Sequence, residues 1–182
     1  NDAEIIFKGK GKTNNGLEIG FQVQLEAEGS GESDHIFFDL NNNSSVGYKF
    51  LATLQPYIID VFKSYGWVFD PKKVMYSGMW AIINKKGDSN NEHIHPNSNL
   101  SAAYYVKAPE DCGEFVVNNP HAINRNIFPD RENPTELNRL IAKHKVEEGD
   151  LLIFPAYLPH HVLPNESDEE RIVISFNLWI RR

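Results

Sequence analysis

The sequence predicts a mainly β fold, a sandwich or barrel of short strands with Greek-key connections and flanking helical structure. Many β-branched or aromatic segments of strand length are separated by Gly, Pro, Asn and Asp clusters. Only one stretch has a long helical period. The 182 residues contain no repeat, linker or low-complexity tract, so they fit one domain. Many short strands beside one long helix are typical of such architectures.

The first third of the chain predicts a hairpin followed by a helix. Residues 1–42 place turn sequences around strand-like runs such as 19–25, which indicates an edge hairpin or meander. Residues 45–65 change to a helical period, and the preceding "NNNSS" is suited to capping a helix. Pro56 is expected to kink this helix or to begin its second half. The apolar stripe of the helix, which predicts core packing, consists of Val46, Phe50, Leu54, Ile58 and Phe62.

Five later segments have the length and composition of strands: 74–83, 100–108, 113–119, 150–156 and 171–180. A polar insertion separates the third from the fourth and contains "NPTELNRLIAK". There, Asn133 is suited to cap a short helix and Pro134 to start it. The insertion from His121 to His144 is the expected lid, because long connections in compact β domains often cover binding sites.

Charge and cysteine content limit the classes of partner and location. A net charge of -7 and a pI near 5.5 argue against a direct nucleic-acid partner. No apolar run has the length of a membrane span, so no membrane partner is expected. The single cysteine, Cys112, excludes an intramolecular disulfide and fits a reducing compartment, which predicts a cytoplasmic location. Nothing near Cys112 suggests an activated nucleophile.

The histidines provide the signal for chemistry. In "NEHIHPNS", His93 and His95 project to the same side if the segment is extended, because strand side chains repeat every two positions. Two close imidazoles can share a transition metal, although two surface histidines beside a turn proline is the plainer interpretation. His160 follows a hydrophobic strand and a proline turn, and Arg171 opens the last strand. His161 faces the opposite side from His160, so only one of the two can join a site.

Three motifs together resemble a known family. The strand "SGMWAIIN", the segment "NEHIHPNSNLSAAYYV" and the segment "GDLLIFPAYLPHHVLPNESDEERIVISFN" are similar to the 2-oxoglutarate/Fe(II)-dependent oxygenases related to prolyl hydroxylases, of the bacterial and phage type. The resemblance covers residues 74–180 and implies a double-stranded β-helix, the jelly roll or cupin-like barrel. It implies a single oxygenase-like domain over 1–182, with its core at about 74–180 and the N-terminal strands and helix of 1–73 packing on that core.

The resemblance also implies site residues. His93 and His160 match the two histidines of the family's iron-binding triad, and Arg171 matches the basic residue that binds the distal carboxylate of 2-oxoglutarate. Tyr105 matches a tyrosine that reaches the same carboxylate, whereas Tyr104 takes that position if the register slips by one. The implied metal is Fe(II), 2-oxoglutarate is the cosubstrate, and O2 is consumed. The implied reaction is hydroxylation of a prime substrate, either a peptide, with prolyl residues the first guess, or a small molecule.

His95 is the departure from the family pattern, because it stands where the usual carboxylate ligand would be. A third imidazole preserves the number of open metal positions but removes one negative charge. His95 is therefore either the third ligand of an all-histidine triad or a bystander beside a two-histidine site. Three further residues, Asn84, Trp80 and Asn177, are candidates to line the pocket, with equally good explanations in packing or capping.

Two alternatives use the same residues differently. The spacing from Gly87 to His95 fits a cupin motif, and the segment from Gly149 to His160 approaches a second one, except that Tyr157 stands where glycine is usual. This favours a cupin-type three-histidine metal dioxygenase that does not use 2-oxoglutarate. The cupin's acidic ligand is absent and cupins do not require Arg171, which favours the oxygenase. A non-catalytic metal- or ligand-binding barrel is the other alternative.

Overall fold

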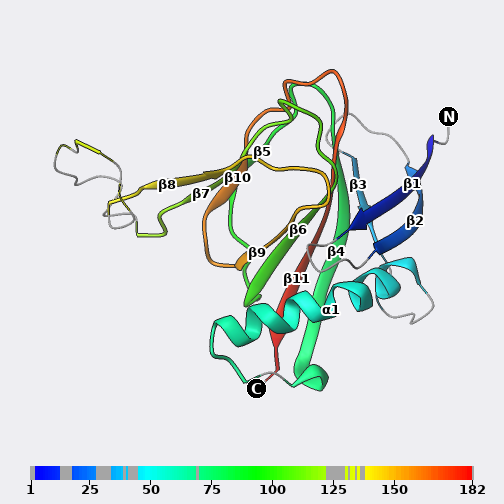
Figure 1. Cartoon of the computed structure of the whole chain (residues 1–182), viewed down its shortest axis with the longest axis horizontal. Coiled ribbons are helices and arrows are strands. Elements are labelled where there is room, and N and C mark those ends of the chain that lie inside the picture. Colours follow the sequence, from blue (N-terminus) through cyan, green and yellow to red (C-terminus); the bar gives the residue numbers. More distant parts are fainter. Residues whose placement is uncertain are drawn as a thin grey trace.

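The structure is a computed structural model, and it describes residues 3–12, 18–27, 34–38, 40, 45–68, 70–121, 130, 132–133, 135 and 138–181. Two antiparallel sheets form its centre (Figure 1). The first, which we call the major sheet, has the strand order β3, β4, β11, β6, β9. Its strands are β3 (Asp34–Phe37), β4 (Val74–Asn84), β11 (Arg171–Ile180), β6 (Leu100–Lys107) and β9 (Leu151–Pro155).

The second sheet, which we call the minor sheet, has the order β5, β10, β7, β8. Its strands are β5 (Asn90–His93), β10 (His160–Val162), β7 (Phe115–Asn118) and β8 (Ile141–His144). From β4 to β11 the chain passes repeatedly between the two sheets, and the first and last of these strands pair with each other in the major sheet. This is the double-stranded β-helix, or jelly roll, and the predicted fold class is confirmed.

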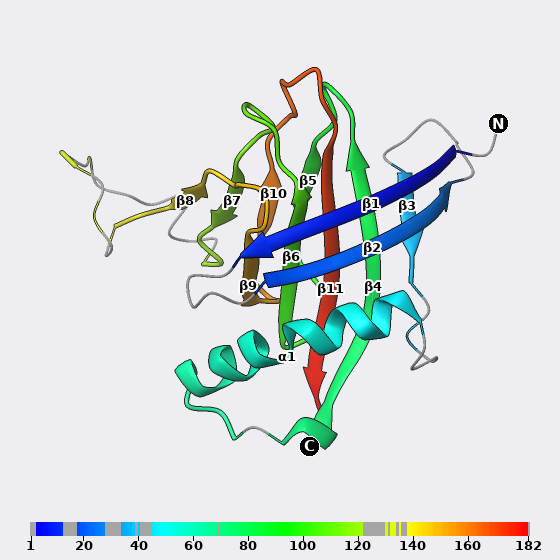
Figure 2. The same ribbon diagram turned by 45° about the vertical axis from the view of Figure 1, so that its right-hand side comes forward.

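The N-terminal elements lie on one side of the major sheet. Strands β1 (Ala3–Lys12) and β2 (Glu18–Ala27) form an antiparallel hairpin, as predicted, and Figure 2 shows it crossing the major sheet on the side of α1. Helix α1 (Val46–Ser64) begins at Ser45, whose side chain accepts a hydrogen bond from the Tyr48 amide at 3.1 Å. The helix is a single element that continues through Pro56. A short 3₁₀ turn, Pro71–Lys73, leads into β4.

The core has two layers because side chains of the major sheet alternate between its faces. On β6, Ala102 and Tyr104 pack toward α1, whereas Ala103 and Tyr105 face the space between the sheets. On β11, even-numbered residues such as Ile174 face α1, and odd-numbered residues face the interior of the barrel. The helix contributes five buried side chains to the first layer: Phe50, Leu51, Leu54, Ile58 and Phe62.

The end of the segment "NPTELNRLIAK" belongs to a strand: Ile141–His144 forms β8, which pairs with β7 in the minor sheet. Pro134, the expected start of a short helix in this segment, lies outside the described residues, as does half of the expected lid. Within the described part of the chain, no helix is both long and apolar enough to cross a membrane.

Candidate active site

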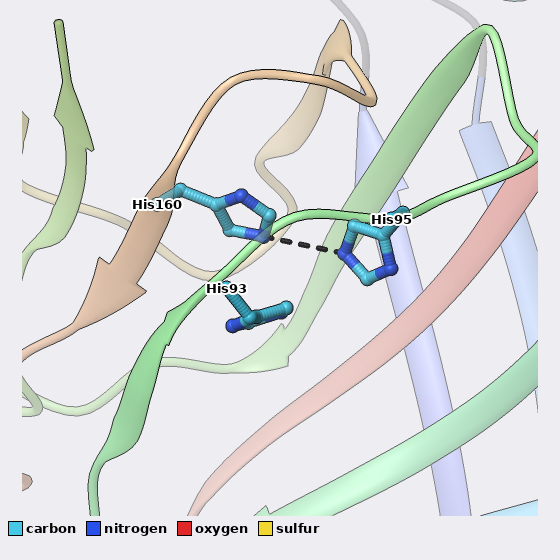
Figure 3. A group of neighbouring side chains, drawn as sticks. All are labelled: His93, His95 and His160. Atoms are coloured by element: carbon cyan, nitrogen blue, oxygen red, sulfur yellow. Dashed lines mark hydrogen bonds between the residues drawn. The ribbon is translucent and has the colours of Figure 1, made fainter. Parts of the chain in front are cut away.

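Three histidines meet at the mouth of the space between the sheets. His93 ends β5 and His160 begins β10, directly opposite it in the register, while His95 follows β5 by two residues (Figure 3). One ring nitrogen from each lies within 4.8 Å of the others, and the Nε2 atoms of His95 and His160 are 3.3 Å apart. The structure therefore brings together all three histidines that the sequence analysis selected as candidate metal ligands.

Backbone pairing fixes where these rings lie. The His95 amide donates to the carbonyl of Ala156 at 2.9 Å, which holds the segment beyond β5 against the turn after β9. Within β5, His93 pairs with His160 and Asn90 pairs with Val162, so three steps on β5 oppose two on β10. This irregularity is a β-bulge, and it allows Asn90 and His93, three residues apart, to face the same pocket.

Hydrogen bonds to carbonyl oxygens set the tautomers of two rings. Nδ1 of His93 lies 2.7 Å from the Asn91 carbonyl oxygen, and Nδ1 of His160 lies 2.9 Å from that of Leu158. Because a carbonyl oxygen only accepts, each Nδ1 carries the proton in the neutral ring and donates it. The Nε2 atom of each ring consequently keeps its lone pair, which is the form that binds a metal.

The site favours neutral imidazole. Burial, together with the neighbouring histidines His160 and His93, lowers the pKa of His95 to about 4. Burial is also the main cause for His160, whose pKa falls to about 4 despite the opposing effect of its bond to the Leu158 carbonyl. Both rings are therefore neutral at pH 7, and protons do not compete with a metal for them.

The histidines stand at one side of a cavity of about 500 Å³. Its wall is mainly apolar, with Trp80 and Phe37 on the side of His95, Phe154 beside His160, and Val173 also in the lining. No Asp or Glu side chain is among the described residues that line it. His95 is thus the third donor available to a metal here, since no carboxylate is at hand to replace it.

Arg171 is fully buried and contacts Asn90, which lines the cavity. Its Nη1 donates to the carbonyls of Cys112 and Leu163, its Nε donates to Asn84 Oδ1 at 3.3 Å, and its Nη2 is 3.4 Å from Asn90 Oδ1. No carboxylate of the described residues forms an ion pair with it. Burial lowers the pKa of Arg171 from its ordinary value, although a guanidinium stays charged at neutral pH. A positive charge that is held only by neutral groups favours an anion nearby.

Tyr105 lines the cavity close to Arg171, which it influences electrostatically. Its side chain is fully buried, and its hydroxyl has no hydrogen-bond partner among the described residues. Burial is the main cause that raises the pKa of Tyr105, so the hydroxyl is protonated and able to donate. A buried hydroxyl without a partner is rare in folded proteins and calls for a ligand or another explanation.

The structure also separates the paired alternatives of the sequence analysis. Tyr104 faces α1 and makes an edge contact with Phe50, on the opposite side of the sheet from Tyr105. His161 faces away from the cluster, and its Nδ1 lies 3.2 Å from Asn118 Nδ2. Of the three candidates for the pocket, Trp80 lines it, Asn84 contacts Arg171 and Asn177 contacts His95.

Sequence reasoning missed two kinds of group. Asn90 was not predicted, because regular strand alternation would point its side chain to the opposite face from that of His93. The bulge between β5 and β10 lets both side chains face the cavity. The contacts of Arg171 with the carbonyls of Cys112 and Leu163 could not be predicted either, because every residue type has a backbone carbonyl. Gly113 is an indirect sign in the sequence that two loops meet here. Its φ is +90°, and a Cβ at this position would lie 2.2 Å from the Leu163 carbonyl oxygen, so the position requires glycine.

A double-stranded β-helix with imidazoles at its mouth is typical of non-haem metal enzymes. The model of the family described as "Putative 2OG-Fe(II) oxygenase" matches residues 78–177, more than half of the chain. The chain belongs to this family of 2-oxoglutarate-dependent oxygenases, and its metal and cosubstrate are Fe(II) and 2-oxoglutarate. No curated protein is a significant match to the chain.

Solved structures share the fold at low sequence identity. A prolyl-4-hydroxylase from Pseudomonas putida has a TM-score of 0.53 at 15% identity, covering 82% of this chain and 72% of its own. The viral collagen prolyl hydroxylase of Paramecium bursaria Chlorella virus-1, in complex with 2-oxoglutarate, has a TM-score of 0.53 at 17% identity, with coverages of 83% and 81%. HygX from Streptomyces hygroscopicus, with nickel and 2-oxoglutarate bound, has a TM-score of 0.55 at 14% identity, with coverages of 84% and 72%. The chain spans 45% of a further match, a 2OG-Fe(II) oxygenase family protein from Burkholderia pseudomallei, at a TM-score of 0.44.

The residues present fit both groups. Two Nε2 lone pairs are already directed by carbonyls, and a third imidazole lies beside them, which suits a transition metal. The Tyr105 hydroxyl, which has no partner among the described residues, and the buried guanidinium of Arg171 are donors that suit a carboxylate.

Proposed function

We propose that this chain is a hydroxylase in which His93, His95 and His160 hold Fe(II), while Arg171 and Tyr105 bind the distal carboxylate of 2-oxoglutarate. One observation carries the proposal: among the described residues, the buried guanidinium of Arg171 has no anionic partner, and the buried hydroxyl of Tyr105, which lines the cavity beside the three histidines, has no hydrogen-bond partner. Leaving these donors unmet costs free energy, which a bound dicarboxylate recovers.

When bound, Fe(II) and 2-oxoglutarate would activate O2, which is the oxidant: one oxygen atom would enter an unactivated C–H bond and the other would enter the succinate that forms as 2-oxoglutarate loses CO2. The chain's own residues orient the cosubstrate and shield the reacting groups from water. Arg171 is held by the carbonyls of Cys112 and Leu163 and by the side chains of Asn84 and Asn90, so the remaining N–H of its Nη2 is fixed before the cosubstrate arrives. Tyr105 adds a neutral donor beside it. The apolar wall at Phe154 and Val173 keeps water from the reacting groups.

For the prime substrate we propose a peptidyl residue, with proline tested first. This choice rests on the two prolyl hydroxylases that share the fold, because the names of those proteins state their activity. The cavity wall at Phe37 and Trp80 is compatible with an uncharged ring, since it offers aromatic surface and no charge. Peptides in which one proline is replaced by alanine provide the matched negative substrate in an assay of 2-oxoglutarate consumption.

The decisive experiment adds Fe(II) and 2-oxoglutarate to the protein without oxygen and records the visible charge-transfer band of the chelate. We expect the band in the wild-type protein and a loss of 2-oxoglutarate affinity of about 100-fold in Arg171→Ala, because a buried charge-assisted hydrogen bond is removed. Arg171 also holds two loop carbonyls, so Arg171→Lys, which keeps the charge without the fork, is measured beside it. Arg181→Ala, at an exposed arginine, is the control.

Two outcomes would reject the proposal. If no band develops in the wild-type protein, 2-oxoglutarate does not chelate a metal here. If the band develops but Arg171→Ala and Arg171→Lys bind 2-oxoglutarate like the wild type, the carboxylate lies elsewhere. His95→Ala tests the third ligand separately, and an unchanged iron affinity would mean that His95 is a bystander.

The family match argues against the alternative of a cupin-type three-histidine dioxygenase that does not use 2-oxoglutarate, but one observation speaks for it. The cluster is all imidazole, and no described carboxylate lines the cavity. In that case Fe(II) binds with the expected affinity, whereas 2-oxoglutarate neither produces a band nor raises the melting temperature. A barrel that only binds ligands would consume no O2 with any cosubstrate.

Two broader expectations stay predictions. We propose that residues 1–182 form a single oxygenase-like domain, in which the N-terminal strands and helix pack on a core at about 74–180. A single cooperative unfolding transition, followed in parallel by circular dichroism and tryptophan fluorescence, is the expected result. The cytoplasmic location suggested by the lone cysteine is to be tested by fractionation of the source cells.

A further inference from the structure

We propose that Asn177, oriented by Ser101, is a positioning residue that selects the tautomer of His95 and thereby decides whether His95 becomes the third ligand. The inference rests on the proposed function. It concerns the one candidate ligand whose distal nitrogen is not bonded to a backbone carbonyl. His93 and His160 each donate Nδ1–H to a carbonyl, whereas Nδ1 of His95 meets a side-chain amide instead.

The amide comes from the centre of the major sheet. Asn177 on β11 is directly opposite Ser101 on β6, and both face the interior of the barrel. The Ser101 hydroxyl, which is almost fully buried, donates to Asn177 Oδ1 at 2.8 Å. Asn177 Nδ2 then lies 3.4 Å from His95 Nδ1. Two strands thus aim one amide at one imidazole, in an order that runs from Ser101 through Asn177 to His95.

This order of hydrogen bonds assigns a proton to each nitrogen. An amide N–H donates, so Nδ1 of His95 accepts and the proton of the neutral ring is on Nε2. His95 Nε2 lies 3.3 Å from His160 Nε2, which keeps a lone pair because the proton of His160 is on Nδ1. His95 therefore donates to His160. In this arrangement the lone pair of His95 points at Asn177 rather than at the other histidines.

Ligation through Nε2 requires the other tautomer, with the proton of His95 on Nδ1. A protonated Nδ1 facing an amide N–H is repulsive, but rotating the Asn177 amide by half a turn presents Oδ1 as an acceptor. The amide oxygen and nitrogen are nearly equal in size, so this rotation needs almost no repacking. The Ser101 hydroxyl supports both orientations because it can donate or accept. Asn177 is thus a two-position element, and only one position makes His95 a ligand.

An aspartate at position 177 would accept a hydrogen bond from His95 in either orientation of its carboxylate, whereas a leucine of similar volume could accept none. We therefore compare the affinity for Co(II), a redox-stable probe, in wild type, Asn177→Asp and Asn177→Leu. We expect Asn177→Leu to weaken Co(II) about 10- to 100-fold, as removing a partner of a ligating histidine typically does. Asn177→Asp should bind at least as tightly as wild type. The visible spectrum of bound Co(II) should report one imidazole ligand fewer in Asn177→Leu than in the wild type, and no change in Asn177→Asp.

A double-mutant cycle with His95→Ala links the effect to this histidine. In the His95→Ala background, Asn177→Leu should leave the Co(II) affinity unchanged. Equal affinity of wild type and Asn177→Leu, or equal losses in Asn177→Leu and Asn177→Asp, would overturn the inference while leaving the proposed function intact. If the wild-type protein itself binds no Co(II), the proposed function fails and this inference fails with it.

Nitrogen-15 spectra of the imidazole rings test the assignment without any change at position 177, so a folding defect in a variant cannot obscure the result. The metal-free protein should show His95 with its proton on Nε2, and the Zn(II)-loaded protein should show it on Nδ1, with His93 and His160 protonated on Nδ1 in both. A metal-free His95 already protonated on Nδ1 would contradict the two-position amide.

Discussion

Replacing Tyr105 with phenylalanine should have opposite effects on the stability of the free protein and on cosubstrate binding. The hydroxyl is buried and has no partner among the described residues, while its ring packs against the apolar layer between the sheets. An unsatisfied buried polar group costs about 1–3 kcal/mol, and Tyr105→Phe removes it while keeping the ring. We expect a gain of about 1 kcal/mol, which for a chain of this size raises the melting temperature by about 2–4 °C.

The same hydroxyl is a proposed donor to 2-oxoglutarate. A hydrogen bond to a charged group contributes about 1.5–3 kcal/mol, so the variant should bind 2-oxoglutarate about 10- to 100-fold more weakly. Thermal unfolding of the metal-free protein measures the first effect, and anaerobic calorimetric titration of the Fe(II) protein measures the second. Tyr104→Phe, one residue along the strand but on the α1 face, is the control and should leave cosubstrate affinity unchanged. A variant with lower stability and unchanged affinity would refute the reasoning, because the hydroxyl would then have a structural role.

Three further predictions concern the fold and the histidines. Gly113→Ala places a Cβ 2.2 Å from the Leu163 carbonyl oxygen and should lower the free energy of unfolding by about 3 kcal/mol or more. Gly87→Ala is the control: its φ of +88° is similar but the space around it is open, so it should lower the free energy of unfolding by only about 1 kcal/mol. Urea titrations measure both losses, and equal losses would argue against the close contact. The metal-free protein should lose stability as pH falls from about 6.5 to about 4, because in this window His95 and His160 bind protons in the unfolded chain but not in the folded protein. Urea titrations at several pH values measure how the free energy of unfolding changes with pH, and no change across this window would contradict the lowered pKa values. Phe62→Ala should cost about 3–5 kcal/mol in the same assay, since the ring is buried between α1 and the major sheet, and a smaller loss would mean that this layer collapses around the gap.

Local patterns in the sequence were sufficient for the long strands and the helix. The composition and length of "LSAAYYVKA" predicted a strand, and the two-residue repeat of strand side chains explains why Tyr105 rather than Tyr104 reaches the interior. Strand β8 could not be predicted, because all four of its residues are exposed and "IAKH" has no strand signal. Its conformation comes from pairing with β7, a long-range contact that local sequence does not encode.

The site was predictable to the extent that it depends on side-chain type. The H-x-H pair and the spacing to His160 identified the cluster, whose members do come together. The surroundings of Arg171 were not predictable, because two of its partners are backbone carbonyls and a third, Asn90, is brought inward by a bulge. Asn177 was a candidate for the pocket, but its relation to His95 depends on the register between β6 and β11.

The alternation of β11 limits how this protein can change over evolution. Arg171 and Asn177 both occupy odd positions of one continuous strand and face the interior, whereas even positions such as Ile174 and Phe176 face α1. Deleting or inserting one residue between Arg171 and Asn177 would turn one of them toward the helix and bring apolar core residues toward the cavity. Substitutions in β11 can therefore be tolerated singly, but changes in length must occur in the connecting loops. Relatives that keep both functions should have five residues between this arginine and this asparagine.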